Sequence, residues 1–222
     1  VVDAIAPQPD QTFIEIGPGP GAITRLLAPR VHALVACEID RDLAAALRTE
    51  ALPDVHVVEG DFLRLGATSL VAAVEAASPG ALSLRVAGNL PYNVASPIMF
   101  RLVDLARSGV PLVDATIMLQ REVADRLLAQ PGSHEYGVLS VLIGHRARVK
   151  RLLNLPPGAF RPAPKVHSTV VRLSFMPPSP AVADEGTLAA ITNAVFSRRR
   201  KTMANALLAL GALTQATAVA AL

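Results

Sequence analysis

The chain has 222 residues, of which 51% are hydrophobic and 18% are charged, and its net charge is +3 at pH 7. That length and apolar content suffice to bury a full core, so they exclude an intrinsically disordered chain. Because Cys37 is the only cysteine, an internal disulfide is excluded, which favours an intracellular, cytoplasmic protein.

The charge is unevenly distributed along the chain. Residues 1–145 carry 10 Lys and Arg against 16 Asp and Glu, a net charge of −6. Residues 146–222 carry 11 against 2, a net charge of +9. A basic last third on an acidic body favours a polyanionic partner such as nucleic acid, although a solvated basic face has the same composition.

The first strand and the loop after it form a nucleotide-binding unit. Thr12–Ile16 is a short apolar strand, residues 17–21 read Gly-Pro-Gly-Pro-Gly, and a helix is expected from Ala22 to Ala28. Gly17, Gly19 and Ala22 match the G-x-G-x-x-A pattern of dinucleotide-binding oxidoreductases. Glu15, Gly17, Gly19 and Gly21 also match E-x-G-x-G-x-G, which resembles motif I of S-adenosylmethionine-dependent methyltransferases.

Acidic residues follow the next two predicted strands. Glu38 follows the strand His32–Cys37, at the distance from the glycine loop where a carboxylate accepts hydrogen bonds from ribose hydroxyls. Asp61 and Phe62 follow the strand Val55–Glu59, where they are expected to hold the adenine of a cofactor. The carboxyl ends of consecutive parallel strands meet at one edge of a sheet, so these residues are predicted to share a site.

The fourth predicted strand, Leu82–Ala87, opens into a loop that reads Gly-Asn-Leu-Pro-Tyr-Asn. Asn89 offers a side-chain carbonyl, and Leu90 offers a backbone carbonyl that the rigid Pro91 helps to aim. Tyr92 offers a flat face for stacking. The two acceptors suit the exocyclic amine of a flat base, and the aromatic face suits its ring. The alternative is a plain turn with a solvated Asn and a half-buried Tyr.

The second half of the chain predicts the rest of the sheet and a stiff loop. Val113–Leu119 is a buried strand, and the alternating patterns at Ala147–Leu155 and His167–Met176 predict an antiparallel pair. The loop Pro156–Lys165 between them contains four prolines and a single aromatic residue, Phe160. Helical patterns are expected at 41–51, 69–77, 96–106 and 121–128, and residues 137–144 form a short helix or strand.

Phe160 has two interpretations of equal weight. On an exposed loop beside Arg161 and Lys165 it would stack on a base of a nucleic acid, and otherwise it packs into the core. His134 and His145 stand apart from other ligand-type residues, so we predict no metal site.

A proline-rich linker at residues 176–180 separates the sheet from a helical end. Helices are expected from Asp184 to Phe196 and from Thr202 onward. Between them lie four consecutive cations, Arg198, Arg199, Arg200 and Lys201, for which phosphate contact is expected. Residues 203–222 carry no charge, but the polar residues among them indicate short packed helices and no membrane span.

Taken in order, these motifs resemble the KsgA-type rRNA adenine N6,N6-dimethyltransferases, and the resemblance spans nearly the whole chain. The segments that carry it are EIGPGPGAIT (15–24), EIDRDL (38–43), GDFL (60–63), GNLPYNVASPI (88–98), LQREVADRL (119–127), PGSHEYGVLSV (131–141), GAFRPAPKVHSTVVRL (158–173) and FSRRRKTMANAL (196–207). The Erm methyltransferases, which confer macrolide resistance by acting on large-subunit rRNA, share much of this plan and are the alternative.

The resemblance implies an α/β fold, a Rossmann-like class I S-adenosylmethionine-dependent methyltransferase sheet over residues 1–176. A small helical domain over residues 181–222 would contact rRNA and is expected to be incomplete. The implied enzyme is a cytoplasmic monomer that dimethylates two adjacent adenines of 16S rRNA in the assembling 30S ribosomal subunit.

The same resemblance implies a role for each site residue. Glu15, Gly17 and Gly19 would line the methionine part of S-adenosylmethionine, Glu38 its ribose, and Asp61 with Phe62 its adenine, and Asn89 would also contact the cofactor. Asn89, Leu90, Pro91 and Tyr92 would hold the target adenine, with Phe160 on its other face, while Arg161, Lys165 and residues 198–201 would contact rRNA. The chain departs from the family before motif I, where a Gly-Gln-x-Phe-Leu segment is missing, and at Ala204, where many relatives have Arg.

Overall fold

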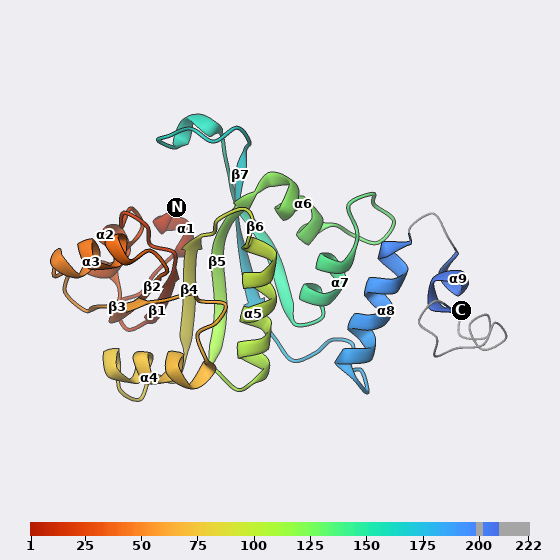
Figure 1. Cartoon of the computed structure of the whole chain (residues 1–222), viewed down its shortest axis with the longest axis horizontal. Helices are drawn as coiled ribbons and strands as arrows, with labels where there is room; N and C mark the ends of the chain where they lie inside the picture. Colours follow the sequence, from red (N-terminus) through yellow and green to blue (C-terminus); the bar gives the residue numbers. More distant parts are fainter. Residues whose placement is uncertain (199–201, 209–222) are drawn as a thin grey trace.

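The computed structural model describes residues 1–198 and 202–208, and a mixed β-sheet is its central layer (Figure 1). Within these residues the sheet has seven strands in the order β3-β2-β1-β4-β5-β7-β6. Strands β1 to β5 are parallel, and β7 and β6 add an antiparallel pair at one edge. The strands are β1 Thr12–Ile16, β2 Ala33–Glu38, β3 Val55–Glu59, β4 Leu84–Asn89, β5 Leu112–Gln120, β6 Ala147–Leu155 and β7 Ser168–Phe175.

Helices cover both faces of this sheet. They are α1 Val2–Ile5, α2 Thr24–Leu27, α3 Arg41–Thr49, α4 Ala67–Ala77, α5 Ala95–Arg107, α6 Arg121–Leu128, α7 Val138–Gly144, α8 Glu185–Ser197 and α9 Met203–Leu208, with 3-10 turns η1 Ala28–Arg30 and η2 Pro157–Ala159. Phe13 packs with α1 and α2 on one face, whereas Ile14 and Ile16 belong to the larger core that includes α4 to α7. Alternate residues of β1 therefore serve the two cores.

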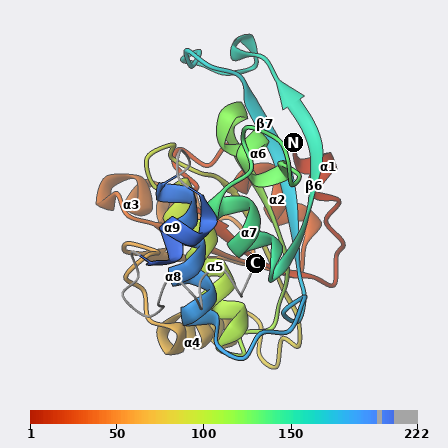
Figure 2. The same cartoon turned by 90° about the vertical axis from the view of Figure 1, so that its right-hand side faces the viewer.

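Helices α8 and α9 lie outside the sheet, beyond α7 (Figure 1), and they face the viewer in Figure 2. The backbone N–H of Ser179 donates to the carbonyl of His145 at 2.9 Å, and Arg146 forms an ion pair with Glu185 at the start of α8. The rings of Tyr136 and Phe196 meet edge to face at 5.7 Å. The predicted helix at 184–196 is confirmed, and α9 confirms the start of the next one, whose continuation beyond residue 208 lies outside the described residues. The division into domains at 176 and 181 stays a prediction. None of the helices in the described ranges combines the length and apolar character of a transmembrane span.

The structure corrects the predicted bounds of two elements, β4 and α2. Gly88 and Asn89 were predicted as loop residues, but they are the last two residues of β4, because Gly88 pairs with Ile16 and Asn89 with Met118. Leu82, predicted to begin this strand, is 92% exposed and lies outside it. The helix predicted at 22–28 is only four residues long and continues as η1, since the turns of the glycine loop extend to residue 23.

A buried ion pair holds the N-terminal helix against the sheet. Arg85 of β4 and Asp114 of β5 form two hydrogen bonds of 2.9 and 3.0 Å, with side chains only 8% and 11% exposed. The same guanidinium donates to the backbone carbonyls of Ile5 and Ala6, at the C-terminal end of α1. Arg172 of β7 also donates to the Ile5 carbonyl, so cations cap the negative end of this helix.

We predict that Arg85→Met lowers the free energy of unfolding by about 3–5 kcal/mol, because it leaves the buried Asp114 without its closest partner. Urea denaturation followed by circular dichroism measures the change. The matched control is Arg107→Met, which removes an exposed arginine whose Asp104 partner lies at 3.5 Å; such surface pairs contribute at most about 1 kcal/mol. Equal losses in the two variants would contradict this role for Arg85.

Candidate active site

A cavity of about 810 Å³ lies at the carboxyl ends of β1 and β4. Its walls come from α1, the glycine loop with the start of α2, the end of β5, and the loop between β6 and β7. Figure 1 shows this last loop projecting beyond the sheet at the same edge as the N-terminus. The lining residues are Val1, Val2, Glu15, Gly17, Pro18, Gly19, Pro20, Ala22, Ile23, Leu26, Asn89, Leu90, Pro91, Tyr92, Met118, Ala159, Phe160, Arg161, Pro162 and Pro164.

The glycine loop has a backbone shape that side chains disfavour. Gly17 and Gly19 have φ values of +66° and +55°, in the left-handed region. The N–H of Gly17 donates to the Cys37 carbonyl of β2, and the N–H of Gly19 donates to the Glu38 carboxylate, both at 2.9 Å. The other Glu38 oxygen accepts from the N–H of Asp40 at 3.0 Å. The buried Glu38 therefore fixes the loop, a task the sequence did not indicate.

Glu15 is the buried carboxyl of the cavity. It is 1% exposed, and its Oε2 atom has no hydrogen-bond partner among the described residues. The pKa of Glu15 is raised to about 7: burial raises it most, hydrogen bonding by Thr24 offsets part of this, and the nearby Glu38 carboxylate adds to the rise. A buried carboxylate of this kind is suited to a cationic ligand group.

The end of β4 approaches β1 so closely that only glycine fits. A Cβ atom built on Gly88 would lie 2.8 Å from the Ile16 carbonyl oxygen and 3.2 Å from the side chain of Leu90. Leu90 is buried, and its N–H donates to the Met118 carbonyl at 3.3 Å. The packing of Leu90 thus sets the direction in which the chain leaves the strand.

The predicted adenine-holding residues gather at the mouth of this cavity. Asn89 is exposed, and no described residue hydrogen-bonds its carboxamide. Tyr92 is 39% exposed, with its hydroxyl 3.5 Å from Ser168 Oγ. Phe160 and Arg161 reach the same cavity from the loop after β6, more than 65 residues along the chain from Tyr92. Phe160 lines the cavity, as the base-stacking interpretation requires.

Other predicted site residues lie elsewhere. Glu38, Asp61 and Phe62 are absent from the lining; Phe62 packs into the main core, and Asp61 accepts from the N–H of Leu63 at 2.9 Å. Lys165 lies on the projecting loop outside the cavity, and Arg198 follows α8. Arg199, Arg200 and Lys201 lie outside the described residues.

The apolar wall of the cavity was not predicted from the sequence. Val1, Val2, Ile23, Leu26 and Met118 contribute to it. Leu26 is 60% exposed, but nothing in the sequence distinguishes it from a core leucine, so no signal marked this wall. Among the described residues no three His, Cys, Asp or Glu side chains are grouped as a metal site.

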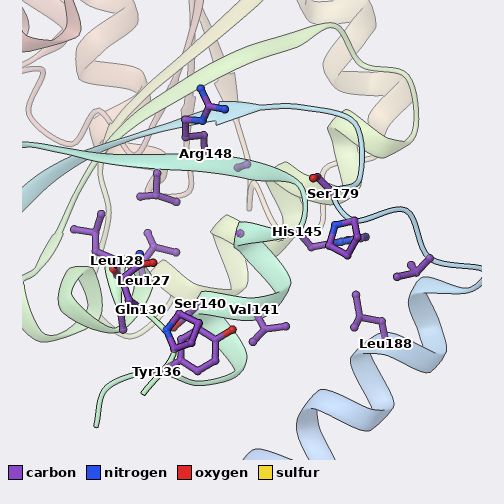
Figure 3. A pocket seen from close by; sticks show the side chains of 17 residues that line it. Leu127, Leu128, Gln130, Tyr136, Ser140, Val141, His145, Arg148, Ser179 and Leu188 are labelled. Carbon is purple, nitrogen blue, oxygen red and sulfur yellow. Dashed lines mark hydrogen bonds between the residues drawn. The ribbon is translucent and has the colours of Figure 1, made fainter. Parts of the chain in front are cut away.

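A second cavity, of about 560 Å³, lies between α6, α7, β6 and the linker before α8. Figure 3 shows His145, Tyr136 and Ser140 around it, with Leu188 of α8 on the far side. None of the predicted catalytic or cofactor residues lines it. This cavity lies at the interface between the helical end of the chain and the rest of the fold.

Comparison with known proteins decides the family. The model of the ribosomal RNA adenine dimethylase family matches residues 1–221. The chain belongs to this family. Its cofactor is therefore S-adenosylmethionine, and the expectation of an S-adenosylmethionine-dependent rRNA adenine dimethyltransferase is confirmed.

Individual relatives and solved structures agree with this family assignment. The chain is 44% identical to "Ribosomal RNA small subunit methyltransferase A" of Aromatoleum aromaticum over 209 residues, 93% of this chain and 74% of the relative. It is 45% identical to the protein of the same name from Chromohalobacter salexigens, over 92% and 72% of the two chains. Among solved structures, a dimethyladenosine transferase from Plasmodium falciparum matches with a TM-score of 0.73 at 26% identity, over 92% of this chain and 70% of that one. The 23S rRNA methyltransferase ErmE matches with a TM-score of 0.68, also at 26%, over 93% and 79%.

The buried Glu15 predicts a pH-dependent stability for the cofactor-free protein. Because folding raises its pKa from 4.5 to about 7, the native state retains a proton that the unfolded chain loses across that interval. The contribution of Glu15 to stability is therefore complete below the unfolded pKa and is lost as the pH rises to about 7. Replacing it with Gln removes this titration.

We expect Glu15→Gln to gain about 2–3 kcal/mol in unfolding free energy relative to the unchanged protein when both are moved from about pH 5 to about pH 8. Urea denaturation at the two pH values, without cofactor, measures this difference. A gap between the two proteins that stays constant with pH would show that Glu15 is ionised in the folded state at both.

Proposed function

We propose that the chain transfers methyl groups from S-adenosylmethionine to N6 of two adjacent adenines in 16S rRNA of the assembling 30S subunit. The observation that carries the proposal is the shared cavity, in which the exposed Asn89 and Tyr92 stand at the mouth and the Glu15 carboxyl, with its Oε2 unpaired, lies inside. A cationic methyl donor and a flat amine-bearing base would meet there.

The residues inside the cavity fit the methionine part of the cofactor. The unpaired Oε2 of Glu15 would accept from its ammonium group, and the left-handed glycines Gly17 and Gly19 leave room for close approach to their backbone. We assign Glu38 to the ribose, and Asp61 with Phe62 to the cofactor adenine, on the opposite side of the glycine loop. Bound there, S-adenosylmethionine supplies an activated methyl group on a sulfonium.

The residues at the mouth would hold the target base. A base inside a helix cannot present N6, so the target adenine must be flipped out of its stack. Asn89 Oδ1 and the Leu90 carbonyl accept from the amine and draw its lone pair out of the ring, which makes N6 a better nucleophile. Pro91 holds the loop rigid, while Tyr92 and Phe160 stack on the two faces of the base. These contacts position N6 in line with the methyl group, so catalysis is positioning and polarisation.

The names of the relatives favour the small ribosomal subunit over the large subunit as the substrate. Those at 44% and 45% identity carry small-subunit names, whereas ErmE, a 23S rRNA methyltransferase, is 26% identical. We assign Arg161, Lys165 and residues 198–201 to rRNA contact, and we propose a monomer that acts in the cytoplasm, where bacterial subunits assemble.

The test is incubation of small subunits that lack adenine dimethylation with tritiated S-adenosylmethionine. We expect label in 16S rRNA, located by nuclease digestion and mass spectrometry as dimethyladenosine at two adjacent positions. Parallel reactions contain 23S rRNA and large subunits. Label in the 23S rRNA alone would establish the Erm-type alternative, and no label in either would contradict both.

Asn89→Ala is expected to lower the turnover number by about 10²-fold or more, because it removes one of the two acceptors that polarise N6. The matched control is Asn93→Ala, four residues along the same segment, which is exposed and does not line the cavity. It should methylate normally. Single-turnover methylation of the undimethylated subunits compares the two variants, and near-normal rates for Asn89→Ala would remove its assigned role.

A further inference from the structure

The basic part of the chain folds into one edge of the sheet. Residues 146–175, which span β6, the projecting loop and β7, contain seven Lys and Arg residues and no Asp or Glu. Those seven are Arg146, Arg148, Lys150, Arg151, Arg161, Lys165 and Arg172. The positive charge of this part of the sequence is therefore concentrated in space, at the edge of the sheet opposite β3.

Three of these cations are neutralised within the fold. Arg146 pairs with Glu185, Arg151 pairs with Asp125 of α6 at 2.5 Å, and Arg172 lies 3.7 Å from Asp114. The remaining four, Arg148, Lys150, Arg161 and Lys165, form no ion pair with any described residue. Arg161 and Lys165 belong to the projecting loop, and the other two are on the edge strand β6.

The two free cations on β6 share one face of the sheet. Arg151 turns toward α6, so by alternation Arg148 and Lys150 turn to the opposite face, where their partners on β7 are Ser174 and Arg172. Both are exposed. Figure 3 shows the Arg148 side chain extending from β6 away from Leu127 and Tyr136.

These cations extend the basic surface away from the active-site cavity. Strand β6 ends at Leu155, directly before the loop that carries Phe160. At about 3.3 Å per residue, Lys150 lies roughly 16 Å and Arg148 roughly 23 Å back along the strand from that end. A base held at the cavity mouth thus has free cations beside it and again some 20 Å away, a distance that the flanking stem of a folded RNA spans.

We propose that Arg148 and Lys150 form a second rRNA contact site, which binds backbone phosphates of the RNA that flanks the target adenines. The proposal rests on the proposed function, since it takes the same rRNA as partner. Phosphate contacts of this kind strengthen binding and set orientation without reading sequence. The rival explanation is that the charges only keep the exposed edge strand from pairing with another sheet.

The test compares the double variant Arg148→Gln/Lys150→Gln with the unchanged protein. The control is Arg48→Gln/Arg107→Gln, which removes the same charge from α3 and α5. Equilibrium binding to small subunits that lack adenine dimethylation is measured from about 50 to 200 mM salt. The β6 variant should bind more weakly, and its plot of log affinity against log salt should be shallower by about 1.4–1.8.

The control variant should keep the slope of the unchanged protein, and both variants should bind S-adenosylmethionine normally. Equal slopes for the β6 variant and the unchanged protein would overturn the proposal, as would equal losses in the control. If the unchanged protein methylates the subunits, such a result leaves the proposed function intact. If it neither binds nor methylates them, the proposed function fails and the second contact site fails with it.

Discussion

The arrangement of the active site depends on a carboxyl that is buried without a full set of partners. Glu15 sits near the end of β1, between β2 and β4, where water does not reach it and where Glu38 adds a second negative group nearby. Such a group is costly when charged and unpaired, so the cofactor-free protein holds it with a raised pKa. In the proposed function this cost is recovered when the cationic cofactor enters, which would make the cavity selective for charge as well as for shape.

The rest of the fold fixes the positions of this carboxyl and of the segment Asn89–Tyr92, to which we assign the target base. Glu38 fixes the glycine loop through the N–H of Gly19, and Gly88 lets β4 approach β1, so that Asn89 at the end of β4 lines the same cavity as Glu15. On the other side, Arg85 and Arg172 hold α1, whose Val2 forms part of the cavity wall. Each of these contacts joins segments that are distant in sequence, so the site exists only in the folded chain.

Much of this was predictable from the sequence because the relevant signals are local. The five parallel strands, the glycine loop and the antiparallel pair follow from apolar runs, glycine spacing and alternation, and the structure confirms them. The start of α3 follows a local rule as well, since Asp is a preferred helix cap and the Asp40 carboxylate accepts from the N–H groups of Asp42 and Leu43. The strand positions of Gly88 and Asn89 were missed because pairing with Ile16 and Met118 outweighs the turn preference of Gly-Asn. The Arg85–Asp114 pair was missed because its members lie 29 residues apart, although an arginine inside an apolar strand is itself a sign of a buried partner.

The central claim is that Glu15 receives the cationic methyl donor in its ionised form, and calorimetric titration with S-adenosylmethionine tests it most directly. Because a pKa of about 7 leaves most of Glu15 protonated at lower pH, the dissociation constant should fall roughly five- to tenfold between about pH 6 and about pH 7.5. Glu15→Gln should bind more weakly and without this dependence, and NAD should not bind to either protein. Affinity that is independent of pH in the unchanged protein, or binding of NAD alone, would contradict the account.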